Sequence, residues 1–98
     1  MNIIETLAGE FKLRPAQAEN TVKLIDEGNT IPFIARYRKE VTGGLTDVVL
    51  RDIDERLKYL RNLQERKEEV IRLIDEQGKL TDQLKAEIEK AEVLQRVE

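Results

Sequence analysis

Residues 47–77, with the sequence DVVLRDIDERLKYLRNLQERKEEVIRLIDEQ, decide the fold of this 98-residue chain. The stretch contains no Pro or Gly; Thr46 precedes it as a candidate N-cap and Gly78 follows it as a candidate C-cap. Its first half carries apolar residues at alternating spacings of three and four, as in a coiled coil: Leu50, Ile53, Leu57 and Leu60. The pattern predicts one long helix of roughly 45 Å with a buried stripe.

The apolar stripe of this helix is interrupted near its middle. Residues 64–69 (QERKEE) contain no apolar side chain, and the stripe resumes with Val70, Ile71 and Ile74. The interruption predicts either a helix that is solvated on all sides there or a bend at which it leaves its first packing partner.

Three shorter helices are predicted before the long one. The first begins at Asn2, a candidate N-cap, and places Ile3, Leu7 and Phe11 on one face. The second covers residues 15–27, from Pro15 in its first turn to Gly28 at its end. The third covers residues 32–41 and has four apolar residues on one arc: Phe33, Ile34, Tyr37 and Val41.

Two further features complete the expected topology. Thr42, Gly43, Gly44 and Leu45 predict a turn, since they lack the Lys and the glycine spacing of a phosphate-binding loop. After Gly78, Thr81 can cap a last helix that folds back antiparallel to the long one. Leu84 and Ile88 would then meet Val70, Ile71 and Ile74 in a second, smaller cluster.

The predicted fold class is therefore all-α. Within residues 1–98, a small N-terminal helical cluster (residues 1–45) is followed by the long helix and the antiparallel C-terminal helix (residues 46–98). The second and third helices, joined at Gly28, have the arrangement of a helix-turn-helix. Because nothing after Ala91 resembles a cap or breaker, we expect the last helix to run to Val97 and Glu98, as in a truncated domain.

Composition excludes most catalytic chemistries. The chain has no Cys and no His. It therefore cannot form disulfides, thiolate nucleophiles or the usual zinc sites, and it cannot use imidazole as an acid or base. Its carboxylates lie among Lys and Arg and form no catalytic pair. We therefore predict no enzyme activity, catalytic residue, metal or cofactor. The N-terminus carries Glu5 and Glu10 and lacks a basic leader, which predicts a cytoplasmic chain without a membrane partner.

The most cationic spot is the third helix. Arg36, Arg38 and Lys39 lie beside its apolar arc and are candidate contacts for nucleic-acid phosphates. The alternative is that Arg36 and Arg38 join the helices together by pairing with a nearby carboxylate: Asp26, Glu27, Glu40 or Asp47. The net charge of −3, from 17 Lys and Arg against 20 Asp and Glu, predicts that any nucleic-acid binding is local and modest.

Three stretches resemble the N-terminal region of Tex, a family of bacterial transcription accessory proteins. They are residues 25–45 (IDEGNTIPFIARYRKEVTGGL), residues 56–61 (RLKYLR) and residues 76–81 (EQGKLT), in the same order and spacing. The resemblance implies a larger protein that also carries an RNase H-like domain, helix-hairpin-helix elements and a C-terminal S1 RNA-binding domain.

The resemblance also implies a function. The chain would be a helical module auxiliary to nucleic-acid binding, RNA or DNA, and to transcription regulation by the full-length protein. Its partners would be nucleic acid, the remaining domains of the same protein and the transcription machinery. The alternative is a purely structural interaction module that docks onto the missing RNase H-like and S1 domains.

Overall fold

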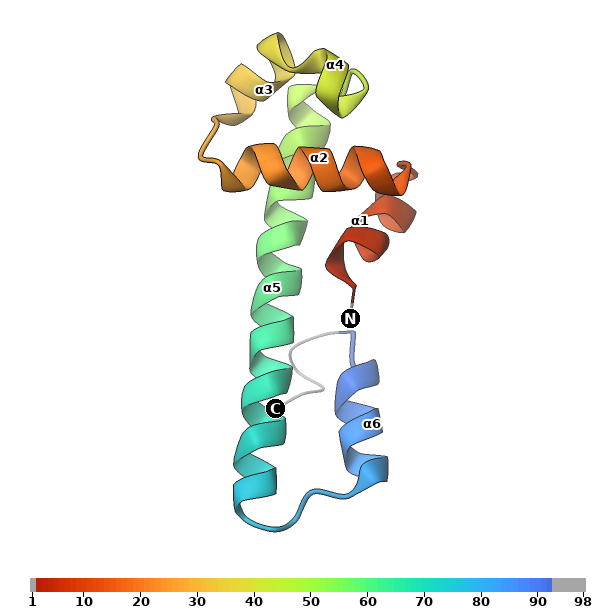
Figure 1. The fold of residues 1–98 in the computed structure, drawn as a ribbon, viewed down its shortest axis with the longest axis vertical. Coiled ribbons are helices and arrows are strands. Elements are labelled where there is room, and N and C mark those ends of the chain that lie inside the picture. The colour runs from red at the N-terminus through yellow and green to blue at the C-terminus, as the bar shows by residue number, and fades with distance from the viewer. Residues whose placement is uncertain (1, 93–98) are drawn as a thin grey trace. The chain divides into compact units, whose positions relative to one another are not determined.

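A computed structural model describes residues 2–92, which form six α-helices and no β-strand (Figure 1). The helices are α1 (Ile3–Phe11), α2 (Pro15–Asp26), α3 (Ile31–Tyr37), α4 (Lys39–Thr42), α5 (Asp47–Glu76) and α6 (Asp82–Lys90). The predicted all-α class and the single long helix are confirmed. The chain divides into two compact units, residues 2–58 and a unit that begins at Tyr59, and α5 contributes to both.

Side-chain caps begin the helices where the sequence predicted them. The Asn2 side chain accepts a hydrogen bond from the Glu5 backbone N–H at 3.1 Å. The Thr46 hydroxyl accepts from Val49 N–H at 3.3 Å, and the Thr81 hydroxyl accepts from Leu84 N–H at 3.0 Å. Each cap satisfies an N–H that has no partner inside its helix, so these residues set where α1, α5 and α6 begin.

The first unit, residues 2–58, is built on the early stripe of α5. In Figure 1, α2 crosses the first part of α5, and Leu24 of α2, Ile34 of α3 and Leu50 of α5 form one buried cluster. Ile53 and Leu57 continue the buried stripe, as predicted. Ile34 anchors α3 in this cluster, and Ile31 and Ala35 of the same helix pack against it, which determines the face of α3 that is left to solvent.

A paired ionic contact also joins α1 to α5 inside this unit. Arg56 donates from Nε and Nη2 to the two carboxylate oxygens of Glu10, each at 2.8 Å. This two-pronged geometry holds the pKa of Glu10 below its ordinary value, chiefly through the hydrogen bonds from Arg56. The partners lie 46 residues apart in sequence, so the contact is a product of the tertiary fold.

The second unit, beginning at Tyr59, contains the antiparallel helix pair. α6 runs back beside the later part of α5 (Figure 1). The buried core of this unit contains Leu63, Ile88 and Ala91. Half-buried apolar residues surround that core: Tyr59, Val70, Ile71, Ile74 and Leu84. The predicted second cluster is thereby confirmed, with Leu63 as a fully buried member outside the predicted stripe.

One of the two alternatives for residues 64–69 is wrong, and so is the expected continuation of the last helix. Residues 64–69 are not solvated on all sides, because Lys67 is only 3% exposed. The last helix does not continue past Lys90, and Ala91 has an extended backbone and packs in the cluster. The expected helical end at Val97 and Glu98 lies outside the described residues.

Candidate nucleic-acid interface

The cationic segment is two helices, which corrects the single helix predicted for residues 32–41. Thr30 is the N-cap of α3, with its hydroxyl accepting from Phe33 N–H at 3.3 Å, and the helix ends at Tyr37. Arg38 leaves the helical region with φ −127° and ψ 33°, and its carbonyl then accepts from Thr42 N–H to start α4. The backbone therefore turns inside the cationic run itself.

Packing of α4 against α2 explains this break. Thr42 is fully buried, and its backbone carbonyl accepts a hydrogen bond from the Gln17 side-chain amide at 2.6 Å. Gly43 ends α4 with φ 76°, and a Cβ atom there would lie 2.5 Å from Gln17 Nε2. The turn after α4 therefore has a structural role, as its sequence predicted. No Pro or Gly separates Pro32 from Gly43, which is why local sequence signals missed the break.

The two aromatic side chains of α3 face solvent. Phe33 is 37% exposed and Tyr37 is 53% exposed, although the sequence placed both on the apolar arc with Ile34 and Val41. At about 100° per residue, Phe33 and Tyr37 lie about 40° apart at one edge of that arc. Ile34 and half-buried Val41 are packed in the core cluster, so the edge that carries the rings remains uncovered.

The arginines of the segment stack on these rings. The guanidinium carbon of Arg36 lies 5.4 Å from the Tyr37 ring centroid, and that of Arg38 lies 5.4 Å from the Phe33 centroid. The two rings are 5.2 Å apart and tilted by 46°. Arg36, Tyr37, Phe33 and Arg38 thus form a continuous row of planar groups, which we call the aromatic–arginine surface.

The predicted carboxylate partners do not hold these cations. Within residues 2–92, no ion pair joins Arg36, Arg38 or Lys39 to an acidic side chain, and all three are exposed. Asp47 pairs instead with Arg51, at 3.6 Å. Arg38 makes one further contact, from Nη1 to the Tyr37 carbonyl at 3.2 Å. The cationic charge of the segment therefore remains accessible to an external anion.

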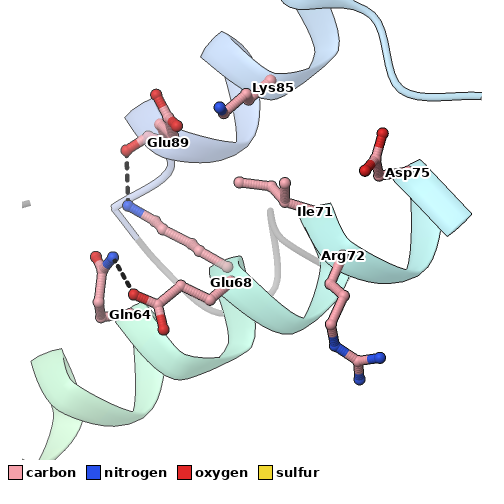
Figure 2. Close-up of a pocket in the computed structure, with 8 residues that line it drawn as sticks. Gln64, Glu68, Ile71, Arg72, Asp75, Lys85 and Glu89 are labelled. Atoms are coloured by element: carbon pink, nitrogen blue, oxygen red, sulfur yellow. Dashed lines mark hydrogen bonds between the residues drawn. The ribbon is translucent and has the colours of Figure 1, made fainter.

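A second polar site lies between α5 and α6 in the later unit. It is a groove with a volume of about 490 Å³, and its lining combines three acids and three bases with one amide and one apolar residue: Gln64, Lys67, Glu68, Ile71, Arg72, Asp75, Lys85 and Glu89. Figure 2 shows these residues at the groove. Gln64 donates its side-chain amide to Glu68 at 3.2 Å. No group of three potential metal-ligating side chains occurs in the part of the chain that the structure describes. The mixed charge favours neither an anion nor a cation.

Lys67 performs a structural task at the edge of this groove. Its ammonium donates to the backbone carbonyl of Glu89, in the last turn of α6, at 2.8 Å. A cation at this position satisfies a carbonyl that has no partner inside its helix and interacts favourably with the helix dipole. Burial lowers the pKa of Lys67, against the opposing effect of nearby carboxylates. Sequence reasoning missed this residue because it reads as part of a charged, solvated run.

Comparison with known proteins identifies the family. Residues 1–75 match the family model described as the Tex-like protein N-terminal domain. The chain belongs to this family. This assignment agrees with the resemblance of residues 25–45, which include α3 and α4, to the Tex family.

Several relatives extend the match over most of the Tex-like chain. It is 59% identical over 78 residues to protein YhgF of Escherichia coli, and this alignment covers 80% of the chain and 10% of YhgF. It is 53% identical over 92 residues to the transcriptional accessory protein Tex of Neisseria gonorrhoeae, covering 94% of the chain and 12% of that protein. A more distant relative, 33% identical over 81 residues, is the S1 RNA-binding domain-containing protein 1 of Pongo abelii. This alignment covers 83% of the chain and 8% of that protein.

The Tex-like chain therefore spans about a tenth of the length of these relatives. None of the helices in the described range is long and apolar enough to cross a membrane.

Proposed function

We propose that this Tex-like module assists nucleic-acid binding by a full-length transcription accessory protein, through phosphate contacts from Arg36, Arg38 and Lys39. The observation that carries the proposal is the exposure of these three cations without carboxylate partners in the described residues. Cations already neutralised by internal ion pairs would have to break those pairs before binding phosphate, whereas these three do not.

The names of the relatives support a role in nucleic-acid binding and transcription. One relative is a transcriptional accessory protein and another contains an S1 RNA-binding domain. Because this chain corresponds to about a tenth of such proteins, its contribution would be auxiliary to that of the other domains. The transcription machinery and those domains are further proposed partners.

The affinity of the isolated chain should be modest and sensitive to salt. Three phosphate contacts predict a slope of log affinity against log salt of about −2 for single strands and about −3 for duplex DNA. The net charge of −3 opposes long-range attraction of a polyanion. We expect measurable binding only at low ionic strength.

Binding to labelled single-stranded RNA and to duplex DNA at two salt concentrations tests the proposal. The triple variant Arg36→Ala, Arg38→Ala, Lys39→Ala should lose binding and flatten the salt slope. A matched triple variant, Lys79→Ala, Lys85→Ala, Lys90→Ala, removes the same charge from the second unit and should keep the slope. Circular dichroism of both variants is the control for folding.

Two outcomes would overturn the proposal. One is the absence of binding by the parent chain at low salt. The other is an equal loss of binding in both triple variants, which would reflect net charge alone. Either result would favour the alternative function, a structural module that docks onto the other domains of the full-length protein.

A further inference from the structure

Exposed aromatic rings are the least expected feature of α3. The chain contains only two Phe and two Tyr, and one of each lies on this seven-residue helix with a large part of its surface in solvent. The remaining aromatic residues, Phe11 and Tyr59, are half-buried. Aromatic side chains ordinarily contribute their large area to a core or an interface. Phe33 and Tyr37 instead leave 37% and 53% of their surface in solvent.

The arrangement of the rings and arginines is suited to a stacking ligand. Tyr37 is the more exposed of the two residues, and its ring contacts Arg36 and Phe33. A guanidinium stacked over a ring keeps its N–H donors in the plane of the group, where they remain available to phosphate oxygens. The surface therefore offers phosphate donors beside two aromatic rings, and an incoming base reaches the face of the Tyr37 ring by displacing the exposed Arg36 side chain.

We infer that the aromatic–arginine surface binds single-stranded nucleic acid, with an unpaired base stacked on Tyr37 and the backbone held by Arg36, Arg38 and Lys39. This inference rests on the proposed function and specifies its substrate class. In a duplex the faces of the bases are covered by neighbouring base pairs, so only a single strand, loop or end presents a base face to Tyr37.

The residues of α3 also indicate weak sequence preference. Its sequence, IPFIARY, contains no Asn or Gln of the kind that reads base edges. Stacking on a ring is tolerant of base identity, because every base has a π-face. The surface would thus recognise an unpaired base and a phosphate without selecting among sequences.

Tyrosine fluorescence gives a direct test, since the chain has no Trp and only two Tyr. The variant Tyr59→Phe leaves Tyr37 as the sole tyrosine. A short single-stranded oligonucleotide, such as oligo-uridine or oligo-thymidine, should quench its emission at low salt, and a matched duplex should quench it much less. The variant Tyr37→Phe keeps a ring for stacking and leaves only Tyr59, so its emission should not change and it controls for light absorbed by the nucleic acid.

Affinity measurements give a second test of the inference. Tyr37→Leu removes the ring and keeps every cation, and it should weaken single-strand binding at least about fivefold, the lower end for loss of one stacked base. Tyr37→Phe should restore parental affinity. Duplex affinity should be the same in all three proteins, because phosphate contacts alone determine it.

The outcomes separate this inference from the proposed function. Binding that depends on the three cations but is unaffected by Tyr37→Leu, with no quenching of Tyr37, would overturn the stacking inference and leave the proposed function standing. Equal or tighter binding of the duplex would also overturn it. The absence of any binding by the parent would overturn both. If Tyr37→Leu fails to fold, the quenching comparison between Tyr59→Phe and Tyr37→Phe decides the question.

Discussion

The two units of this chain use their charged residues in opposite ways. In residues 2–58 the core is closed by apolar side chains, and Arg36, Arg38 and Lys39 remain at the surface. In the unit that begins at Tyr59, a lysine is buried and its ammonium completes the end of α6. A cation therefore stays exposed at the surface in one unit and completes the end of a helix in the other.

The largest expected effect concerns the apolar core of the first unit. Leu57 is 1% exposed, and Leu57→Ala should lower the free energy of unfolding by about 2 to 5 kcal/mol through lost burial and a cavity. For a small domain that loss approaches the whole stability. Leu73→Ala, the same change at an exposed position of α5, is the matched control and should cost under about 1 kcal/mol. Thermal unfolding measures both, and equal midpoints would contradict the assignment of the core.

The buried lysine should show the next largest effect. Lys67→Ala removes both the packed stem and the contact with the Glu89 carbonyl, and we expect a loss of about 1 to 3 kcal/mol. Lys67→Met keeps a stem of similar shape and avoids the burial of a charge, so its loss should be smaller. Hydrogen exchange of the α6 amides, with urea unfolding, measures the difference. Unchanged protection of α6 in Lys67→Ala would show that the cap is unimportant.

The stability of the chain at alkaline pH gives a second test of the burial of Lys67. Burial lowers the pKa of Lys67 below its ordinary value of 10.5. Between the folded and unfolded pKa values the unfolded chain binds more protons, so the free energy of unfolding rises with pH in that window. Measured relative to Lys67→Met, which lacks the titrating group, the stability of the parent should therefore increase as pH approaches 10.5. A flat or falling difference would be inconsistent with this burial.

Two neighbouring glycines test the turn that places α4. Gly43 and Gly44 both have positive φ, but only at Gly43 would a Cβ meet Gln17. Gly44→Ala should cost about 1 kcal/mol from backbone strain alone. Gly43→Ala should cost about 1 kcal/mol more, because it also disturbs the hydrogen bond between Gln17 and Thr42. Urea unfolding compares the two, and equal losses would show that Gln17 adjusts freely.

The smallest expected effect is that of the contact between Glu10 and Arg56. Both side chains are 36% exposed, so after allowance for solvent screening Glu10→Gln should cost only about 0.5 to 1 kcal/mol at neutral pH. The pKa of Glu10 is lowered, so its contribution is present above the unfolded pKa and is lost as pH falls through the folded pKa. Urea unfolding of parent and variant should converge in acid. A difference that persists in acid would assign the effect to packing instead.

The aromatic–arginine surface shows how far the sequence alone could predict this site. The pattern of residues 32–41 identified Arg36, Arg38 and Lys39 as one cationic site, and the structure leaves them exposed. It placed Phe33 and Tyr37 on the buried arc, because helical periodicity assigns a face but does not say how wide a strip of that face the neighbours cover. The spacing of Phe33, Arg36, Tyr37 and Arg38 was the available signal, in a chain with only four aromatic residues.

By itself the sequence determined the helices, most of their ends and the apolar stripes. Caps such as Asn2, Thr46 and Thr81, and the glycines between elements, act over three or four residues and are therefore readable locally. Only the tertiary structure decided the break at Arg38, the role of Lys67 and the outward direction of Tyr37. These depend on side chains that approach from other helices, and the energy of a charge or a ring is set by what surrounds it.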